Sequence, residues 1–270
     1  MTDFWDSVLT FSRSQTTLVG ERLLTAFGKA QAEEKRDGSL VTAFDQWSDQ
    51  TLTAAIREAF SDHGVLSEET SHVFPDQDWC WVIDPIDGTT NFTWGVPLWS
   101  ISLGLLYRGT PVYGYVYVPT LGHHFHGYWP GDSGLGMPTG AFLNGQPIQP
   151  RPDAPTKHQL FSLCARSLLA LQNPFPCKIR MLGVASYNLL AVAAGSVVGS
   201  VEATPKIWDI AGAWPILQAA GAIWTPLDGQ QPFPLVVGTN YRDRPYPTLV
   251  SNHEAHTAIF EPLVQAVAHR

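Results

Sequence analysis

The spacing of apolar side chains predicts two amphipathic helices at the start of the chain. From about Thr2 to Ala26, apolar residues recur with polar residues between them, at intervals that fit a long helix. A second helix is expected to begin near Thr42, because threonine is a good N-cap and apolar residues follow it at roughly helical spacing. Residues 31–40 interrupt the pattern, and Asp45 would lie in the first turn of the second helix.

Beyond Val65 the pattern changes to short β-rich runs separated by glycine and proline, which predicts a largely antiparallel sheet. The predicted strands are residues 79–83, 99–107, 111–118 and 124–128. Further along, strands and helices alternate, with predicted strands at 160–163 and 200–203 and predicted helices at 185–194, at 209–220 and from about 254. A proline-rich connector at 147–155 suggests two subdomains, residues 1–146 and 147–270.

The composition is that of a chain with a large core. Of its 270 residues 44% are hydrophobic, which is enough for one large domain or two closely packed halves. No stretch is apolar for long enough to span a bilayer, and the acidic N-terminus is unlike a signal peptide, so a cytoplasmic protein is expected. Three cysteines without metal-ligand spacing, Cys80, Cys164 and Cys177, predict buried free thiols.

The net charge of −8 argues against a nucleic-acid surface, because such a surface needs clustered Lys and Arg to neutralise phosphates. An acidic protein would also repel a phosphorylated small molecule. A bound divalent cation is the simplest way to attract one, since such an ion is often the largest local charge in a site.

Two carboxylates end the predicted strand at 79–83 and form the most informative segment of the chain. Asp84 and Asp87 are separated by Pro85, which restrains the backbone so that both carboxylates can point toward one place. Gly88 follows and would let the backbone approach a ligand closely.

Known loop types can be compared with this segment by their spacing. If a short helix begins near Thr89, the free N–H groups of residues 88–90 would face a phosphate. A calcium loop of the EF-hand type and a haloacid-dehalogenase nucleophile both need carboxylates two residues apart, and a P-loop needs a Gly-Lys-Ser or Gly-Lys-Thr that is absent. An Asp-Pro turn with solvated carboxylates stays open as the plain alternative.

Residues 84–92, Asp-Pro-Ile-Asp-Gly-Thr-Thr-Asn-Phe, resemble the signature of the inositol monophosphatase family and its lithium-sensitive phosphatase relatives. Further segments that resemble family motifs, in the same order along the chain, are residues 40–45, 66–70, 140–145, 180–185 and 208–213. The resemblance therefore covers nearly the whole chain. It implies a phosphoric monoester hydrolase with an α/β (α+β) fold, a layered αβαβα sandwich of the inositol-monophosphatase and fructose-bisphosphatase type. It also implies lithium sensitivity and a homodimer.

The resemblance implies two or three Mg²⁺ ions per active site. Glu68, Asp84 and the carbonyl of Ile86 would bind one ion, and Asp84, Asp87 and Asp209 a second. Magnesium prefers carboxylate oxygens, waters and phosphate oxygens, and two ions about 3.5–4 Å apart can clamp both oxygens of an in-line displacement. Without a cation, acidic side chains gathered this closely would repel one another and take up protons.

The resemblance also assigns roles in catalysis and substrate binding. Thr89, hydrogen-bonded to Asp45, and Glu68 would orient and deprotonate a metal-activated water, without a covalent phosphoenzyme. Lys35 would close over the phosphate, or would remain a solvated surface lysine. The other expected substrate contacts are Asp87, Gly88, Thr89, Gly183, Ala185, Glu202 and Asp209.

Three departures from the family pattern, Ser67, Trp94 and Val198, bear on the identity of the alcohol. Trp94 and Val198 are expected near the wall against which the leaving group sits. Inositol monophosphate is the favoured substrate, with fructose 1,6-bisphosphate, histidinol phosphate and a nucleotide 3′-phosphate as alternatives. From another class, the chain could serve as an interaction module in a transcription complex, as some bacterial relatives do.

The run His123-His124-Phe125-His126 offers a second candidate site. His124 and His126 would alternate onto one face of a strand, as metal ligands can. No third ligand of matching spacing is evident, so a polar hairpin edge is the preferred interpretation.

Overall fold

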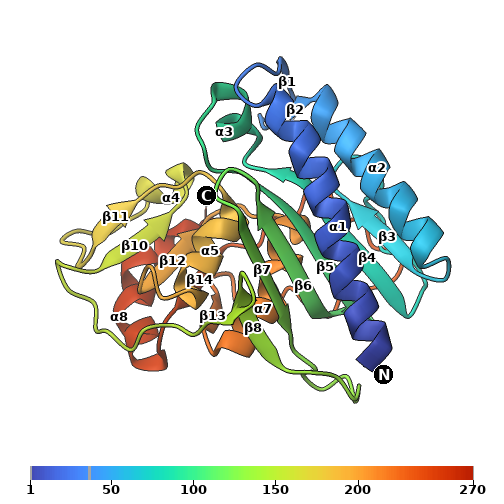
Figure 1. The fold of residues 1–270 in the computed structure, drawn as a ribbon. Coiled ribbons are helices and arrows are strands. Elements are labelled where there is room, and N and C mark those ends of the chain that lie inside the picture. The colour runs from blue at the N-terminus through green and yellow to red at the C-terminus, as the bar shows by residue number, and fades with distance from the viewer. Residues whose placement is uncertain (1, 36–37, 270) are drawn as a thin grey trace.

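The computed structural model describes residues 2–35 and 38–269, and it is built around two β-sheets (Figure 1). The larger sheet has seven strands in the order β3-β4-β5-β6-β7-β8-β9. Its strands are β3 (Gly64–Ser67), β4 (Trp79–Asp87), β5 (Ser100–Tyr107), β6 (Thr110–Val118), β7 (His123–Tyr128), β8 (Gly140–Leu143) and β9 (Gln146–Pro147). Only β3 and β4 are parallel neighbours in this sheet, so the expected antiparallel character is confirmed.

The smaller sheet has five strands in the order β11-β10-β12-β14-β13, and its parallel pairs are β10 with β11 and β10 with β12. Its strands are β10 (Leu160–Leu163), β11 (Lys178–Arg180), β12 (Gly199–Glu202), β13 (Ile223–Pro226) and β14 (Thr248–Ser251). A short hairpin of β1 (Ala32–Glu34) and β2 (Leu40–Thr42) occupies much of the segment in which the helical pattern breaks.

Helices separate and cover the two sheets, so the molecule has five layers (Figure 1). Helices α1 (Thr2–Ala26) and α2 (Ala43–Ala59) pack on the outer face of the larger sheet, and α5 (Ala185–Ala193), α6 (Ile207–Ala211) and α7 (Ala213–Ala220) lie between the sheets. Helix α8 (Glu254–Val264), followed by a 3₁₀ turn (Gln265–His269), covers the smaller sheet. Short helices α3 (Thr89–Trp94) and α4 (Ala165–Leu168) follow strands β4 and β10. This arrangement is the layered α/β fold that the sequence predicted.

Three apolar clusters fill the spaces between the layers. One joins α1 and α2 to the larger sheet, through buried residues such as Val8 and Trp81. The second lies between the sheets around α5–α7, and the third packs Phe260 of α8 against Phe161 of β10. No helix in the described ranges combines the length and the hydropathy that crossing a membrane requires.

The segment predicted as one helix at 209–220 is two helices. Helix α6 begins two residues earlier, at Ile207, and Gly212 separates it from α7. The helices lie close to the larger sheet here, since a Cβ on Gly212 would lie 2.4 Å from the Ser102 hydroxyl, and a Cβ on Gly114 of β6 would lie 1.9 Å from the carbonyl oxygen of Gly212. The close approach to β5 explains the glycine. The break has a local cause, because Pro215 in the first turn of α7 has no N–H to donate to the carbonyl oxygen of Ala211.

The expected subdomains, residues 1–146 and 147–270, remain a prediction. The strands of the smaller sheet all come after the proposed boundary, whereas β9 crosses it. The candidate site residues come from both sides.

Candidate active site

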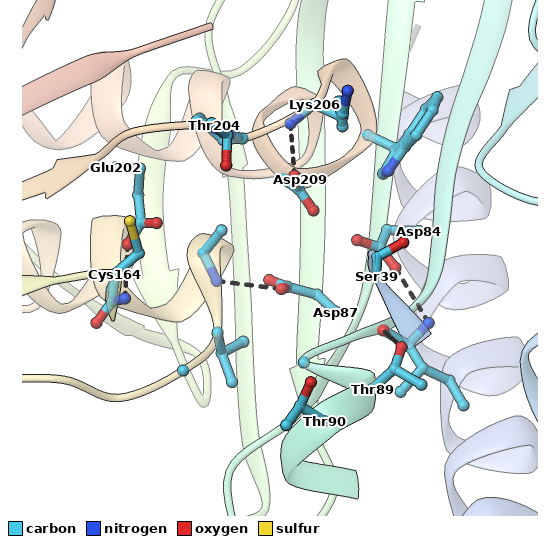
Figure 2. A pocket seen from close by; sticks show the side chains of 18 of the residues that line it. Ser39, Asp84, Asp87, Thr89, Thr90, Cys164, Glu202, Thr204, Lys206 and Asp209 are labelled. Carbon is cyan, nitrogen blue, oxygen red and sulfur yellow. Dashed lines mark hydrogen bonds between the residues drawn. The ribbon is translucent and has the colours of Figure 1, made fainter. Parts of the chain in front are cut away.

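A cavity of about 350 Å³ opens where the C-terminal end of β4 meets the N-terminal ends of α3, α5 and α6 (Figure 2). All predicted site residues except Asp45 and Lys35 line it. These are Glu68, Asp84, Ile86, Asp87, Gly88, Thr89, Gly183, Ala185, Glu202 and Asp209. Residues from distant parts of the chain thus face one space.

A bulge in β4 turns two carboxylates to the same side. Residues three apart on a regular strand face opposite sides of the sheet. In the pairing with β5, however, Asp84 lies opposite Ser102 and Asp87 opposite Ser100, so three steps on β4 match two on its partner. The extra residue brings Asp84 and Asp87 onto one face.

Asp209 completes an acidic triad from the other side of the cavity. Carboxylate oxygens of Asp84, Asp87 and Asp209 lie within 4.8 Å of one another. Asp209 is held in the first turn of α6, where its Oδ2 accepts a hydrogen bond of 2.5 Å from the backbone N–H of Lys206 (Figure 2). The same bond caps the helix, so Asp209 is fixed by the start of α6.

The carboxylate of Asp87 is oriented by the start of α5. The backbone N–H groups of Ala185 and Ser186 donate to its two oxygens at 3.1 and 2.7 Å. The N–H of Ala185, expected to face the substrate, is therefore engaged by Asp87. Gly88 allows the close approach between β4 and this segment, since its φ is +92° and a Cβ there would lie 2.8 Å from a methyl group of Val184.

Burial and mutual repulsion make the charged forms of these acids costly. Burial and the nearby acids, Glu68 first, raise the pKa of Asp84, and burial together with Asp209 raises that of Asp87 to about 7, despite its two hydrogen bonds. Burial also raises the pKa of Glu68 to about 8, against the favourable charge of Lys35. Asp84 is 1% exposed, and no hydrogen-bond donor in the described residues reaches its Oδ2.

These features fit a divalent cation. Oxygen ligands from three carboxylates, converging on one point, are the donor set that Mg²⁺ and similar hard cations take. A cation would partner the orphaned Asp84 oxygen and would relieve the repulsion among the acids.

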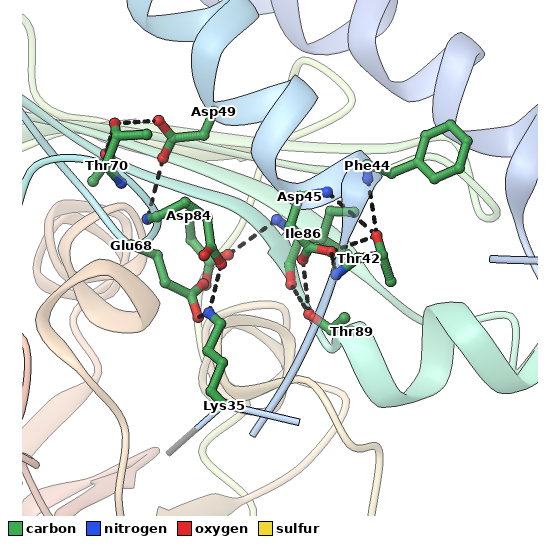
Figure 3. Close-up of polar contacts among 12 residues, drawn as sticks. Lys35, Thr42, Phe44, Asp45, Asp49, Glu68, Thr70, Asp84, Ile86 and Thr89 are labelled. Atoms are coloured by element: carbon green, nitrogen blue, oxygen red, sulfur yellow. Dashed lines mark hydrogen bonds and ion pairs between the residues drawn. The ribbon is translucent and has the colours of Figure 1, made fainter. Parts of the chain in front are cut away.

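Asp45 and Thr89 form a polar pair behind the acidic cluster (Figure 3). Asp45 is fully buried at the start of α2, and its Oδ2 accepts hydrogen bonds from the backbone N–H and the hydroxyl of Thr42, at 2.7 and 2.6 Å. The Thr89 hydroxyl lies 3.0 Å from both Asp45 Oδ1 and the carbonyl oxygen of Ile86. Burial raises the pKa of Asp45 to about 6, against these hydrogen bonds.

Lys35 reaches the cluster from the β1–β2 hairpin. Its ammonium forms ion pairs of 2.7 Å with Glu68 and 2.5 Å with Glu69 (Figure 3). Burial lowers the pKa of Lys35, but the two glutamates outweigh this effect and raise it overall. Of its two expected locations, Lys35 therefore occupies the one near the site, paired with a predicted metal ligand.

The opposite wall carries the predicted Glu202 together with two groups that the sequence did not predict, Asn188 and Cys164. Glu202 is 3% exposed, and its carboxylate accepts a hydrogen bond of 2.6 Å from the Asn188 side chain on α5. Cys164 also lines the cavity and is half-buried, whereas Cys80 and Cys177 are buried as expected. Strand ends were the signal for Asp84, and the same signal at the end of β10 could have identified Cys164.

Thr90, which belongs to the segment expected to face a phosphate, also lines the cavity, and further lining residues that the sequence did not indicate are Ser39, Arg166, Thr204 and Lys206. Two residues expected near the leaving group do not line the cavity. Trp94 is 78% exposed, at the end of α3, and Val198 is buried in the core beside the smaller sheet. The expectation that they shape the wall of the site was therefore wrong, because sequence proximity to a motif does not place a side chain in its cavity.

Comparisons with known proteins agree with this geometry. The model of the inositol monophosphatase family matches residues 5–267. A fructose-1,6-bisphosphatase/inositol-1-monophosphatase of Aquifex aeolicus is 31% identical over 220 residues, covering 76% of this chain and 80% of the relative. A protein of Neisseria meningitidis serogroup B, named putative Nus factor SuhB, is 32% identical over 226 residues, covering 78% of this chain and 84% of the relative. The solved structure of a Thermotoga maritima IMPase superposes with a TM-score of 0.79 at 28% identity, covering 97% of this chain and 96% of the other.

Proposed function

Because the chain belongs to the inositol monophosphatase family, whose members hydrolyse phosphate monoesters, we propose that it is a magnesium-dependent phosphatase of a small polyol or sugar phosphate, with inositol monophosphate favoured. The observation that carries the proposal is the triad of Asp84, Asp87 and Asp209, whose oxygens converge within 4.8 Å in the cavity. Glu68 and the carbonyl of Ile86 would complete the metal ligands.

Magnesium held there would supply Lewis-acid stabilisation of the phosphoryl and leaving oxygens. The residues of the chain orient the attacking water. Thr89 donates its one hydroxyl proton to Asp45 or to the Ile86 carbonyl, so its oxygen lone pairs are free to accept a hydrogen bond from the water. The water loses one proton on attack, and this proton passes either through the Thr89 hydroxyl to Asp45 or directly to Glu68.

The substrate is recognised by the walls of the cavity. The N–H groups at the start of α3, residues 88–90, face the phosphate. Carboxylate oxygens of Asp87, Glu202 and Asp209 accept hydrogen bonds from the hydroxyls of the alcohol, beside the backbone of Gly183 and Ala185. Lys35 is paired with Glu68. When a cation binds the Glu68 carboxylate in its place, the Lys35 ammonium is near enough to contribute to phosphate binding.

The test is phosphate release from a panel of inositol 1-phosphate, fructose 1,6-bisphosphate, histidinol phosphate and adenosine 3′,5′-bisphosphate, with magnesium and with EDTA. We expect one strongly preferred substrate and release only with magnesium. Release in EDTA, or none from the whole panel, would contradict the proposal. Lithium should inhibit phosphate release from the best substrate. Release that is unchanged across a lithium titration would contradict the expected lithium sensitivity alone and leave the proposed reaction standing.

A second function has one specific observation in its favour, the relative named putative Nus factor SuhB. Such a role would make this chain an interaction module in a transcription complex, and a homodimer is compatible with either function. Affinity capture from native lysate tests it directly. Recovery of RNA polymerase or antitermination factors would support it, and their absence would count against it.

A further inference from the structure

A second cavity, of about 500 Å³, is lined by residues of α1 and of the β6–β8 region of the larger sheet. It shares no lining residue with the acidic cavity. The side chains that line it are Leu9, Arg13, Tyr115, His124, His126, Phe142 and Asn144. The family function described above uses none of them.

The two histidines line this cavity from β7, which is an interior strand. It pairs with β6 on one side and with β8 on the other, so the expectation of a hairpin edge was wrong. His124 and His126 are two residues apart and therefore share one face of the sheet. The β6 and β8 strands on either side supply the rings that hold them.

Contacts fix both imidazole rings. His124 Nδ1 is hydrogen-bonded to the Tyr115 hydroxyl at 2.8 Å, and its ring stacks on Tyr117 with centroids 4.2 Å apart. His126 stacks on Phe142 with centroids 4.8 Å apart and planes at 15°. The cavity therefore has prepositioned aromatic walls, which lowers the entropy lost when a flat molecule binds.

The lining is positive, although the protein as a whole carries a net charge of −8. No acidic residue lines the cavity, and no carboxylate in the described parts of the chain forms an ion pair with Arg13. Burial first, and then the charge of Arg13, lower the pKa of His124 and of His126, the latter to about 4, which favours the neutral form of both rings. The cation of Arg13 and the lack of a carboxylate ligand oppose a metal ion here.

Several hydrogen-bond donors remain open toward this space. The Arg13 guanidinium presents a planar fork of N–H groups, which matches carboxylate and phosphate oxygens. The Asn144 side-chain oxygen accepts from the backbone N–H of His124 at 2.8 Å, which leaves the N–H groups of its amide for a ligand. The ring nitrogens of His126 form no hydrogen bond with the described residues.

We propose that this cavity is a second ligand site, which binds a small organic anion with a flat apolar body. Arg13 and the Asn144 amide bind the anionic group, and His126, Phe142 and Leu9 contact the body. The anion is a carboxylate or a phosphate monoester, since each presents a pair of oxygens that a guanidinium can bind through two parallel hydrogen bonds.

Binding is measured in EDTA with benzoate, phenyl phosphate and benzyl alcohol as probes, by following the imidazole NMR signals of His124 and His126. Without a cation the acidic cavity repels anions and phenyl phosphate is not hydrolysed, so the signals report the second site. We expect saturable shifts with benzoate, phenyl phosphate or both, and the stronger of the two names the anion class. Benzyl alcohol should bind at least ~10-fold more weakly than that anion.

Two variants test the assigned contacts. Arg13→Gln should weaken anion binding by at least ~10-fold, because a charge-assisted pair is lost. Asn144→Asp keeps the acceptor for the His124 N–H and tolerates the left-handed backbone of this position, φ 52°, but places a negative charge where the anion binds. It should abolish binding.

Arg22→Gln is the matched control, since Arg22 is exposed on the same helix and does not line the cavity. The affinity of Arg22→Gln for the anion should equal that of the wild type. The proposal is overturned if no anion gives saturable shifts, if Arg13→Gln binds as tightly as wild type, or if benzyl alcohol binds as well as benzoate. Phosphatase activity with magnesium should be unchanged in Arg13→Gln, and this distinguishes failure of this site from failure of the proposed function.

Discussion

Single residues in the acidic cavity are held by bonds that also build the fold. Asp209 caps α6, Asp87 accepts two N–H groups from α5, and Asp45 caps α2 through Thr42. Each carboxylate is therefore placed before any ligand arrives, which is how a preorganised site reduces the loss of entropy on binding. Substitutions here can remove a charge and still leave the structural bond in place.

Asp209→Asn separates the two roles of that residue. The asparagine oxygen can still accept from the Lys206 N–H and cap α6, but it removes one charge from the acidic triad. We expect magnesium-dependent kcat/KM to fall by at least ~100-fold, because metal stabilisation of the transition state is worth several kcal/mol. The melting temperature measured in EDTA should rise, because repulsion is relieved.

Asp132→Asn is the matched control for that change, since Asp132 is an exposed carboxylate in the loop after β7. It should alter neither quantity. Unchanged magnesium-dependent turnover in Asp209→Asn would refute the assigned metal site.

Thr89 offers a test of water activation that leaves the carboxylates intact. Thr89→Val keeps the shape of the side chain but removes the hydroxyl between Asp45 and the Ile86 carbonyl. We expect kcat to fall by ~10²–10⁴-fold, the usual contribution of general acid–base catalysis, while calorimetric magnesium affinity stays within a few-fold. Thr89→Ser retains the hydroxyl and should keep most of the activity. Equal losses in both variants would indicate a packing role.

At the scale of elements, the cavity depends on close backbone contacts that only glycine permits. Gly88 joins β4 to α3 with a φ of +92°, and a Cβ there would meet Val184 and the carbonyl oxygen of Gly183 at 2.8 and 3.2 Å. The contact brings the start of α5 against β4, where it binds Asp87. A side chain at position 88 would push the two elements apart.

Gly88→Ala should lower the free energy of unfolding by about 2–4 kcal/mol, the sum of backbone strain and overpacking. Gly229→Ala is a matched control, because Gly229 has a φ of +72° but open space around its Cβ position, so only about 1 kcal/mol of strain is expected. Both are measured by urea unfolding. A loss for Gly88→Ala no larger than that of the control would mean that the contact with α5 is not tight.

The long elements could be predicted from the sequence because their patterns are local. Helix α1 has the predicted bounds, and the Thr42 cap and the start of α5 at Ala185 are confirmed. The break between α6 and α7 could have been predicted from Pro215, which lacks an N–H, whereas the need for glycine at position 212 could not, since it comes from the Ser102 hydroxyl on a strand more than a hundred residues earlier. The interior position of β7 likewise depends on pairing with β8 across a loop.

The candidate site shows the same division. The acidic residues lie in recognisable motifs, so the sequence could place them in one cavity. Asn188 was missed, because nothing in the sequence of its helix indicates that its side chain donates a hydrogen bond to Glu202. Likewise, the bulge that aligns Asp84 with Asp87 is visible only in the register between β4 and β5. Sequence patterns therefore indicate which side chains a site contains, whereas the pairing of distant strands determines the directions in which those side chains point.

At the scale of the whole molecule, the acidic cluster lies where both sheets and the helices between them meet. Asp84 and Asp87 come from β4 of the larger sheet, Glu68 directly follows β3, and Asp209 comes from a helix between the sheets. Repulsion among buried carboxylates therefore acts across the junction of layers, so their ionisation should affect the stability of the entire fold.

The pH dependence of stability follows from the direction of the pKa shifts. In the unfolded chain these acids have pKa values of about 4. In the folded, metal-free protein, burial and neighbouring acids raise the pKa of Asp45 to about 6, of Asp87 to about 7 and of Glu68 to about 8. Between these limits the folded state binds more protons than the unfolded state, so the free energy of unfolding in EDTA should fall as pH rises from about 4 to about 8.

Magnesium should reverse this trend, because it binds the deprotonated carboxylates and replaces the protons as their partner. Urea unfolding at intervals from pH 5 to pH 8, in EDTA and in excess magnesium, should therefore show that stabilisation by the metal grows with pH. In Asp209→Asn, the decline in EDTA should be shallower, because burial is then the main remaining cause that raises the pKa of Asp87. Two results would contradict this interpretation: a metal-free stability that rises with pH through this window, or a stabilisation by magnesium that is independent of pH. Either would mean that the buried carboxylates do not take up protons in the metal-free protein and do not exchange them for a cation.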